Sequence, residues 1–473
     1  MGYGAEAGTA TICLTGDAMI TRRMSVYDEP QYLGLVEIIR SADVAITNAE
    51  MLFHNYENPA SYIPGGTYMR AHPRMIEELE WLGISMVASA NNHAYDFDEN
   101  GLLQHLNNLE AAGIAHAGIG RDASEARAPS YLETAAGRVG LVSVTFSGPP
   151  ALYAQYASRD TIGRPGANMI RYTNSYTVDR ATFEIFHRFR DEFGLSGGPG
   201  KSHWRRFQDL SLGLSQLPDS ATDFFMADLH DEWQYPHPAG YRFRLGDGFG
   251  RRAHADELDV AENLQRISDA RRMADWVVVS IHSHEDGATA DEPSEILVDF
   301  AHAAIDAGAD IVHGHGPHRD RGIEVYRGRP IFYSIGHFIF QNDTIERIPL
   351  DNLLRQGLSA AATPADFADA RSGREWMNEW SDGARNPDRW RDVIALADFE
   401  DHALRRIRLV PIDLGFQRRR FQRGRPMLAT GKDAEDVIGL FQKLSARWNT
   451  HIEWREGIGM IDVNKPDPPE DSL

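Results

Sequence analysis

The chain has 473 residues, of which 42% are hydrophobic and 25% charged, a balance typical of a soluble globular protein. Its formal net charge of -21 argues against nucleic acid as a partner, because phosphate backbones are bound through clustered Lys and Arg. No stretch reaches the roughly 18 apolar residues of a membrane helix, the opening residues lack a signal-peptide pattern, and the single Cys13 cannot form an internal disulfide. We therefore expect a cytoplasmic protein that contacts neither nucleic acid nor membrane.

Short apolar runs alternate with amphipathic segments along most of the chain, which indicates an α/β fold. The apolar runs predict strands at residues 11–15, 43–50, 84–89, 137–146, 276–281 and 310–312. The amphipathic segments predict helices at residues 33–41, 73–82, 101–112 and 296–307. After residue 401, strands at 404–415 and 450–460 flank a helix at 433–448.

The first two strands end in carboxylates. Asp17 follows the first strand, and Asn48 and Glu50 end the second with a spacing that turns both side chains to one side. We predict that Asp17 and Glu50 bind a metal ion, although Asp17 taken alone also fits an ordinary turn. We assign Arg22 and Asn48 to substrate binding; Arg22 fits an anionic group of the substrate or a plain surface charge.

The third strand runs into Asn91, Asn92 and His93. An amide oxygen can ligate a metal while a neighbouring imidazole gives or takes a proton, so we predict Asn92 as a ligand and His93 as an acid or base. The alternative is that the asparagines form a turn and the histidine caps a helix.

Histidines gather where the later strands end. His282 and His284 follow one strand with same-face spacing, residues 311–318 hold three histidines in six positions, and His337 follows shortly after. Mixed oxygen and nitrogen donors suit Mn, Fe, Zn, Mg or Ca, so we predict one or two divalent ions and no organic cofactor. Two ions would favour hydrolysis, whereas one would polarise a carbonyl and acidify its Cα proton. A solvated His-rich loop is the plain alternative.

Two irregular segments interrupt this pattern. Residues 147–271 are rich in aromatic residues, Gly and Pro, with a polar helix near 180–193, and we interpret them as a cover over the active site rather than a structural decoration. Residues 341–401 form the second irregular segment, and residues 464–473 a disordered tail. Because no repeat or low-complexity linker divides the chain, we predict one elaborated domain over residues 1–463.

An ordered set of short motifs resembles the CapA-type poly-γ-glutamate capsule-biosynthesis family, within the calcineurin-like metallophosphoesterases. The motifs are Gly16-Asp17, Asn48-Ala-Glu50, Ala90-Asn-Asn-His93, His282-Ser-His284-Glu285, Gly314-His-Gly-Pro-His318 and Tyr333-Ser-Ile-Gly-His-Phe-Ile-Phe340. The resemblance covers residues 10–146, 275–340 and 404–463. It implies an α/β/β/α sandwich with metal ligands on the loops at one edge.

By position, the resemblance also implies roles for single residues. The implied ligand set is Asp17, Glu50, Asn92, His282 and His315, with Glu50 in the bridging place. His93 matches the general acid beside the ligand asparagine. His284 and His318 fit as ligands or proton carriers.

Two departures from the family pattern concern the site. The Asp-x-His that is usual at the first strand in the superfamily is here Asp17-Ala-Met19, so one ligand is missing and we expect a weak or empty first metal position. His337 stands where the family has Asn. We predict that His93, His284, His318 and His337 supply the proton-transfer groups.

The resemblance leaves three activities open. We favour Cα epimerisation, L to D, of a residue in a ribosomally made precursor peptide such as a lasso peptide, as in soluble relatives of this family. The alternatives are metal-dependent hydrolysis of a phosphoester or of a peptide or amide bond, and a capsule role or polymer binding without catalysis. Membership of a fold does not decide the reaction.

Overall fold

The structure is a computed structural model that describes residues 8–193, 220–227, 240–375 and 387–463. Two compact units make up the chain. Residues 1–169, 263–293 and 301–473 form the main unit, which contains every candidate site residue, and residues 170–262 with 294–300 form the second. Among the described helices, none is long and apolar enough to cross a membrane.

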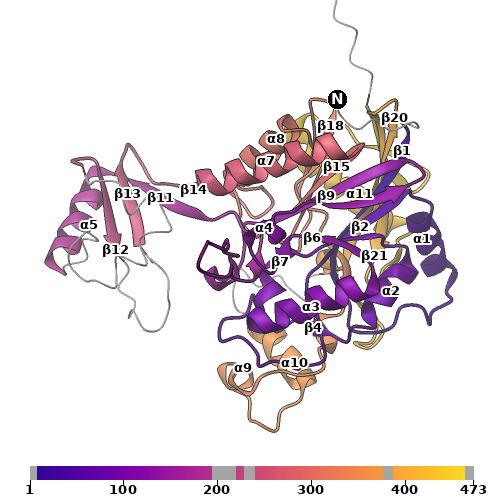
Figure 1. The fold of residues 1–473 in the computed structure, drawn as a ribbon, viewed down its shortest axis with the longest axis horizontal. Coiled ribbons are helices and arrows are strands. Elements are labelled where there is room, and N and C mark those ends of the chain that lie inside the picture. The colour runs from indigo at the N-terminus through magenta and orange to yellow at the C-terminus, as the bar shows by residue number, and fades with distance from the viewer. Residues whose placement is uncertain (1–7, 194–219, 228–239, 376–386, 464–473) are drawn as a thin grey trace, which may run out of the picture. The chain divides into compact units, whose positions relative to one another are not determined.

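The larger sheet of the main unit has ten strands (Figure 1), in the order β23-β24-β21-β20-β1-β2-β5-β6, with β19 beside β1 and β22 beside β21. Five of them pair in parallel: β1 (Ala10–Met19), β2 (Val44–Ala49), β5 (Met86–Ala88), β6 (Ala115–Ala117) and β19 (His337–Phe340). The others pair antiparallel: β20 (Arg391–Glu400), β21 (Ala403–Asp413), β22 (Met427–Leu428), β23 (Glu453–Arg455) and β24 (Ile458–Asp462).

The smaller sheet has six strands in the order β17-β18-β16-β15-β9-β8. Its inner strands run parallel, and an antiparallel strand closes each edge. The bounds are β8 (Ser130–Thr134), β9 (Gly137–Thr145), β15 (Trp276–His282), β16 (Ile311–His315), β17 (Ile323–Tyr326) and β18 (Arg329–Phe332).

The two sheets pack face to face through one apolar core. Ile12 and Leu14 of β1 lie in the same core as Val278 and Ile311 of the smaller sheet, whereas Cys13 between them belongs to the core on the helix side. Successive strand residues point to opposite faces, so this continuous apolar run fills both cores at once. Each fully buried aliphatic side chain contributes about 1.5–3 kcal/mol.

Helices cover the outer faces of the sheets, which confirms the predicted α/β/β/α sandwich. The larger sheet carries α1 (Pro30–Arg40), α2 (Met75–Leu82) and α3 (Asp98–Ala112), whose buried residues join its core. Proline begins α1, and the left-handed Gly83 and Gly113 end α2 and α3, as helix geometry favours. The parts of α7 (Glu257–Met273) and α8 (Glu295–Asp306) that belong to the main unit lie beside the smaller sheet (Figure 1).

Shorter elements complete the main unit. The helix α11 packs against β17, β20, β21 and β24. The bounds are β3 (Leu52–Phe53), β4 (Arg70–Ala71), β7 (Ile119–Gly120), β10 (Gly166–Ala167), α4 (Ala123–Ala126), α9 (Leu350–Arg355), α10 (Pro364–Glu375) and α11 (Lys432–Ser445).

The structure corrects one sequence-based prediction in this part of the main unit and shows where the chain changes sheets. The segment 341–401 is not irregular throughout, because β20 lies within it and pairs with both β1 and β21. Its apolar stretch is short and flanked by charges, which concealed a central strand. The run 330–340 is two strands in different sheets, β18 and β19, because the chain crosses from one sheet to the other between them.

The second unit is more regular than its composition indicates. It contains a four-stranded sheet in the order β12-β13-β11-β14, and the helix α5 (Arg180–Glu192) coincides with the predicted polar helix. Its core is built from Val178, Phe183, Phe224 and Phe243. The strands are β11 (Tyr172–Val178), β12 (Asp223–Ala227), β13 (Gly240–Leu245) and β14 (Gly250–Ala255). A role as active-site cover stays a prediction, and the predicted tail at 464–473 lies outside the described residues.

Candidate metal centre

The carboxyl ends of parallel strands from both sheets bring the predicted ligands together. Asp17 lies in β1, Glu50 directly follows β2, and Asn92 begins a short 3-10 helix after β5. His282 and His315 end the paired strands β15 and β16, where they are opposite each other in the register. All five side chains are buried.

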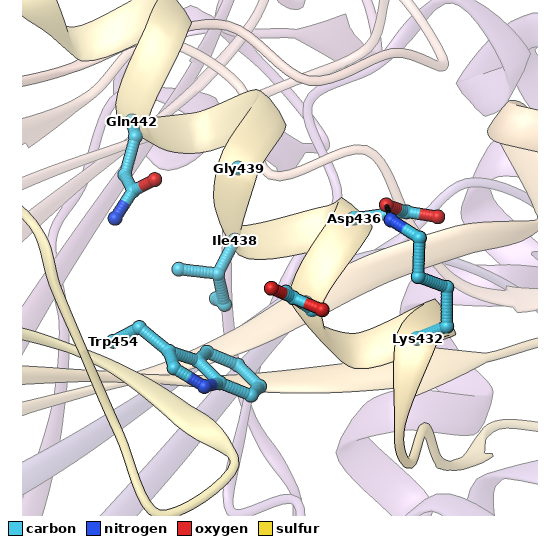
Figure 2. Close-up of a pocket in the computed structure, with 7 residues that line it drawn as sticks. Lys432, Asp436, Ile438, Gly439, Gln442 and Trp454 are labelled. Atoms are coloured by element: carbon cyan, nitrogen blue, oxygen red, sulfur yellow. Dashed lines mark hydrogen bonds and ion pairs between the residues drawn. The ribbon is translucent and has the colours of Figure 1, made fainter.

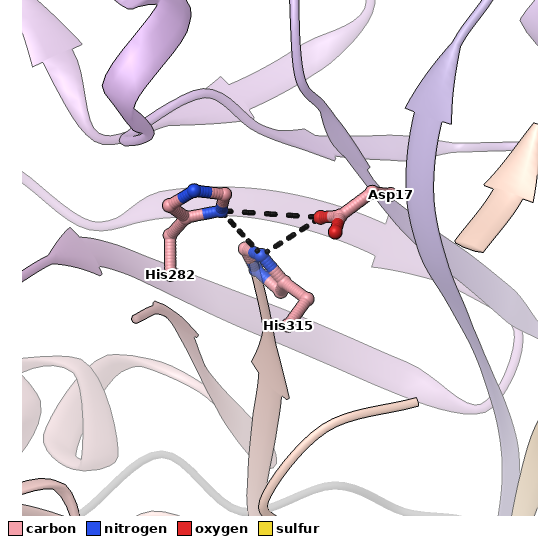
Figure 3. Close-up of side chains that lie close together, drawn as sticks. All are labelled: Asp17, His282 and His315. Atoms are coloured by element: carbon pink, nitrogen blue, oxygen red, sulfur yellow. Dashed lines mark hydrogen bonds and ion pairs between the residues drawn. The ribbon is translucent and has the colours of Figure 1, made fainter. Parts of the chain in front are cut away.

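Asp17, His282 and His315 form the first ligand group. Their three ligand atoms lie within 4.8 Å of one another. Figure 3 shows the two imidazoles turned toward the carboxylate: Oδ1 of Asp17 is 3.3 Å from Nδ1 of His315 and 3.9 Å from Nδ1 of His282. The two Nδ1 atoms are 3.1 Å apart. This spacing is compatible with three donors around one ion.

A buried hydrogen-bond chain sets which nitrogen of His315 is free. Nε2 of His313 lies 3.0 Å from the Thr15 carbonyl, which can only accept, so this nitrogen carries a proton and Nδ1 is an acceptor. The Ser280 hydroxyl, 3.2 Å from that Nδ1, must donate to it and accept from Nε2 of His315 at 2.8 Å. Nδ1 of His315 therefore keeps its lone pair and faces Asp17.

Asn92 and Glu50 present oxygens to the same centre. The Asn92 amide nitrogen donates to the Gly65 carbonyl at 2.7 Å, which turns its Oδ1 toward Nε2 of His282 at 2.8 Å. Both carboxylate oxygens of Glu50 are buried without a hydrogen-bond partner. Oε1 of Glu50 lies 3.8 Å from Nε2 of His282 and 3.5 Å from Nε2 of His318.

The two buried carboxylates, Asp17 and Glu50, favour a positive charge at this centre. Burial raises the pKa of Glu50 well above its usual range, and the charge of Asp17 adds to this effect. Burial also acts to raise the pKa of Asp17, but the neighbouring imidazoles of His315, His318 and His282 outweigh it and hold that pKa well below its usual value. Without a cation, burial therefore favours the protonated form of Glu50.

The imidazoles of His282 and His284 do not supply this positive charge, because they are not protonated at neutral pH. Burial lowers the pKa of His282 well below its usual value and that of His284 to about 3, so both are neutral at pH 7. Neutral imidazole is the form that ligates metals. The orphaned oxygens of Glu50, together with carboxylate, amide and imidazole donors, fit a divalent cation such as Mn, Zn, Fe, Mg or Ca.

His93 is oriented by Asp96, a residue that sequence reasoning missed. The Asp96 carboxylate accepts backbone N–H groups from Gly65 at 2.8 Å and Met69 at 2.7 Å, and lies 2.6 Å from Nδ1 of His93. His93 must donate through Nδ1, so its Nε2 carries a lone pair, 4.0 Å from Oε1 of Glu50. The position of Asp96, three residues after His93, was the only sign in the sequence that the two side chains could interact. His313 carried a similar signal, two residues before His315.

The other predicted histidines surround the first ligand group. Nε2 of His284 lies 3.2 Å from Nε2 of His282. Glu50, His284 and His318 form one further group of possible ligands, and Asp17, His318 and His337 form another.

The two predicted substrate-binding residues occupy different places. Asn48 is fully buried and donates to Oδ1 of Asp17 at 2.7 Å, so it orients that carboxylate. Arg22 donates to the carbonyls of Phe421 and Arg423, outside the cluster. Substrate binding by either residue stays a prediction.

A surface cavity of about 400 Å³ is formed by residues of α11 and by Trp454 of β23 (Figure 2). None of the candidate site residues lines it. Its walls are Lys432, Glu435, Asp436, Ile438, Gly439, Gln442 and Trp454.

Comparison with known proteins supports the resemblance seen in the motifs. The sequence model of the family described as bacterial capsule synthesis protein PGA_cap matches residues 11–342. Two uncharacterized proteins of Sinorhizobium fredii, y4sH and y4uA, are each 30% identical over 95% of this chain and 92% of their own length. A probable polyglutamine synthesis accessory protein of Mycobacterium tuberculosis is 28% identical over 57% of this chain and 49% of its own. The PGA biosynthesis protein CapA of Bacillus subtilis is 46% identical over 21% and 27%. The chain belongs to this capsule synthesis family, the CapA family of the metallophosphoesterase superfamily.

Proposed function

We propose that the protein is a metal-dependent enzyme that acts on a peptide by proton transfer through His93. The observation that carries the proposal is the pair of His93 and Asp96, joined at 2.6 Å beside the buried carboxylate Glu50. A base whose second nitrogen is anchored to a carboxylate is oriented and stabilised when it takes a proton. Its position next to metal-type donors supports the proposal that proton transfer and carbonyl activation take place in one centre.

The residues divide into those that hold an ion and those that move a proton. Asp17, His282 and His315 would hold it, with oxygens of Asn92 and Glu50 completing the shell. A bound divalent ion polarises a carbonyl group and thereby makes the adjacent Cα–H more acidic.

The first candidate reaction is Cα epimerisation of one residue, from L to D. Nε2 of His93 removes the Cα proton, and a second imidazole returns a proton to the opposite face, so that the bonds broken and formed balance. We assign the second role to His284, whose ring lies 5.0 Å from that of His282.

The names of two relatives support an amino-acid polymer as the substrate class. One is a probable polyglutamine synthesis accessory protein and the other a PGA biosynthesis protein. A ribosomally made precursor peptide, such as that of a lasso peptide, shares the amide backbone and the Cα–H that the reaction needs. A capsule role on poly-γ-glutamate is compatible with the same centre.

Hydrolysis is the second candidate function, favoured by one specific observation. Asp17, His318 and His337 form a further group of possible ligands beside the first. Two neighbouring ions would clamp a carbonyl or phosphoryl oxygen and activate water, the basis of amide or phosphoester hydrolysis.

One experiment separates these reactions. The full chain, loaded with Mn²⁺, is incubated in heavy water with precursor peptides, poly-γ-glutamate or a nitrophenyl phosphate, followed by mass spectrometry and chiral amino-acid analysis. Epimerisation predicts a gain of about one mass unit with inversion at one residue, lost by about 100-fold or more in His93→Gln. His302→Phe is a matched control, because His302 stacks on Tyr326 instead of joining the cluster.

Other outcomes have direct meanings. A fragment or released phosphate would establish hydrolysis in place of epimerisation. A metal-loaded protein that leaves every substrate unchanged would contradict the proposal that it is an enzyme acting on these classes.

A further inference from the structure

We propose that Gly66 is a specificity-determining residue of this site, whose bare backbone borders Nε2 of His93 and binds the main chain of a peptide substrate. Gly66 lies in the loop between β3 and β4 and is exposed, whereas His93 is buried. The inference deepens the proposed function and rests on it, because it takes His93 as the group that the substrate approaches.

The loop that carries this glycine is fixed to Asp96, the residue that orients His93. The Asp96 carboxylate accepts the amides of Gly65 at 2.8 Å and Met69 at 2.7 Å. The Asp96 carbonyl accepts the Ser61 amide at 2.9 Å. One residue therefore holds both the imidazole and the loop beside it, which fixes their positions relative to each other.

Close approach of the loop to the 3-10 helix η1 (Asn92–Tyr95) explains the first glycine of the pair. A Cβ on Gly65 would stand 2.2 Å from the main-chain oxygen of Asn92, far inside contact distance. The Gly65 carbonyl also accepts the side-chain amide of Asn92 at 2.7 Å. Only glycine lets the backbone come this close.

Packing does not explain Gly66 in the same way. Among the described residues, a Cβ on Gly66 would meet only the imidazole of His93, 3.4 Å from Cε1 and 3.7 Å from Nε2, which are ordinary contact distances. A methyl group thus has room there, but it would cover the nitrogen that we assign as the base. Glycine keeps this approach open. The φ of Gly66, 159°, offers a competing, conformational reason for glycine.

The Gly66 backbone also has hydrogen-bonding groups to offer. Within the part of the chain that the structure describes, neither its amide nor its carbonyl is hydrogen-bonded, whereas the amides of Gly65 and Met69 are. In an antiparallel pair of chains, two opposed residues exchange both N–H···O bonds at a Cα–Cα distance of about 5.5 Å. A peptide paired with Gly66 in this way lies beside Nε2 of His93 whatever its sequence, because main-chain bonds do not depend on side chains.

Such a contact selects for an α-linked main chain. In an α-linked peptide, Cα alone separates the N–H and C=O of one residue, which matches the single residue opposite. In a γ-linked glutamate chain, Cα, Cβ and Cγ separate them, so the two groups cannot both pair with Gly66. A phosphoester has no N–H to offer at all.

The test measures how fast diethyl pyrocarbonate modifies His93 in the full chain loaded with Mn²⁺, with mass spectrometry of the digest to resolve this histidine from the others. We expect N-acetyl-trialanine amide to slow the reaction in wild type, and tri-γ-glutamate not to. Replacing one amide of the peptide at a time by an ester removes a single N–H. One of these replacements should weaken the protection about 2–10-fold.

Gly66→Ala should slow the modification of His93 without peptide. It should also weaken protection by a peptide with a central leucine about 10-fold more than protection by trialanine. Gly439→Ala is the matched control, because a Cβ on Gly439 in α11 meets nothing within 4 Å. A merely conformational role of Gly66 predicts a lower melting temperature with unchanged selectivity between the peptides. If Gly66→Ala does not fold, the ester comparison in wild type decides.

Equal protection by amide and ester peptides, or no protection by any peptide, would overturn the inference. Cα exchange in heavy water that Gly66→Ala leaves unchanged for both peptides would also overturn it, and would leave the proposed function standing. Selective protection by the amide peptide, but no turnover of any substrate, would support the role of Gly66 in binding and contradict the proposed function.

Discussion

At the scale of single residues, fixed acceptors decide the state of the imidazoles at this centre. The Thr15 carbonyl forces the protons along His313, Ser280 and His315, and two backbone amides force Asp96 to accept from His93. Partners of this kind commonly tune a metal-ligating histidine. The side chains of Ser280 and Asp96 can each be replaced while all the predicted metal ligands are kept.

Ser280→Ala removes the partner of Nε2 of His315. We expect Mn²⁺ affinity to fall about 10–100-fold, because the ring loses its fixed tautomer and orientation. Calorimetric titration checks the affinity, and nitrogen-15 spectra of the ion-free protein report the tautomer directly. Ser268→Ala is the control, since that hydroxyl donates to the Ala307 carbonyl. Equal affinities for Ser280→Ala and wild type would contradict the role of the chain.

Asp96→Asn keeps the shape of the side chain but offers His93 an N–H in place of an acceptor. The expected tautomer then has a proton on Nε2, so His93 no longer acts as a base. We predict a fall in turnover of about 100-fold or more with little change in metal affinity. The heavy-water assay gives the rate and dialysis the affinity; a parallel loss of both would instead show a structural role.

At the scale of elements, a buried histidine joins a helix to a strand. On α3, His105 is buried, and its Nδ1 accepts the Phe53 amide of β3 at 3.1 Å. Burial lowers the pKa of this imidazole from 6.5 to about 3, with smaller contributions from His116 and His54. The helix is therefore joined to β3 through a neutral ring.

This contact makes stability depend on pH. Below pH 6.5 the unfolded chain binds a proton at His105 that the folded chain does not, so the free energy of unfolding falls as pH decreases toward 3. The effect of one such group approaches about 1.4 kcal/mol per pH unit. His105→Asn retains an acceptor near Nδ1 but does not titrate, so its melting temperature should fall less than that of wild type between pH 7 and 5. Identical slopes would contradict the assignment.

At the scale of the whole molecule, the centre exists because two sheets place their carboxyl edges together. Cys13, the single cysteine, lies between Ile12 and Leu14 in β1, belongs to the core on the helix side of the larger sheet, and is fully buried. Burial raises the pKa of its thiol to about 12, with a small opposing effect of Arg408. The thiol is thus both hidden and protonated near neutral pH.

Cys13 should therefore report unfolding of the main unit. We predict that iodoacetamide at pH 8 labels the chain fully in urea and negligibly in the native state. Saturating Mn²⁺ should slow native-state labelling, since an ion at 100 times its dissociation constant adds about 2.7 kcal/mol to the free energy of unfolding. Rapid labelling of the native protein would contradict this burial, and mass spectrometry follows the reaction.

The sequence by itself determined the alternation of strands and helices and the metal-type residues at the strand ends, because these are local patterns of period and composition. Asp17, Glu50, Asn92, His282 and His315 are such residues. The family resemblance implies that they form one ligand set, and the structure brings them together. The sequence did not reveal β20, because the short apolar run of this strand carries little local signal. It also did not reveal the contact of Asp96 with His93. Only the tertiary structure decided that His337 lies beside Asp17, because the pairing of β1 with β19 joins segments that are far apart in the chain. Such pairings depend on which faces both sheets can bury, a property of the whole fold and of no single segment.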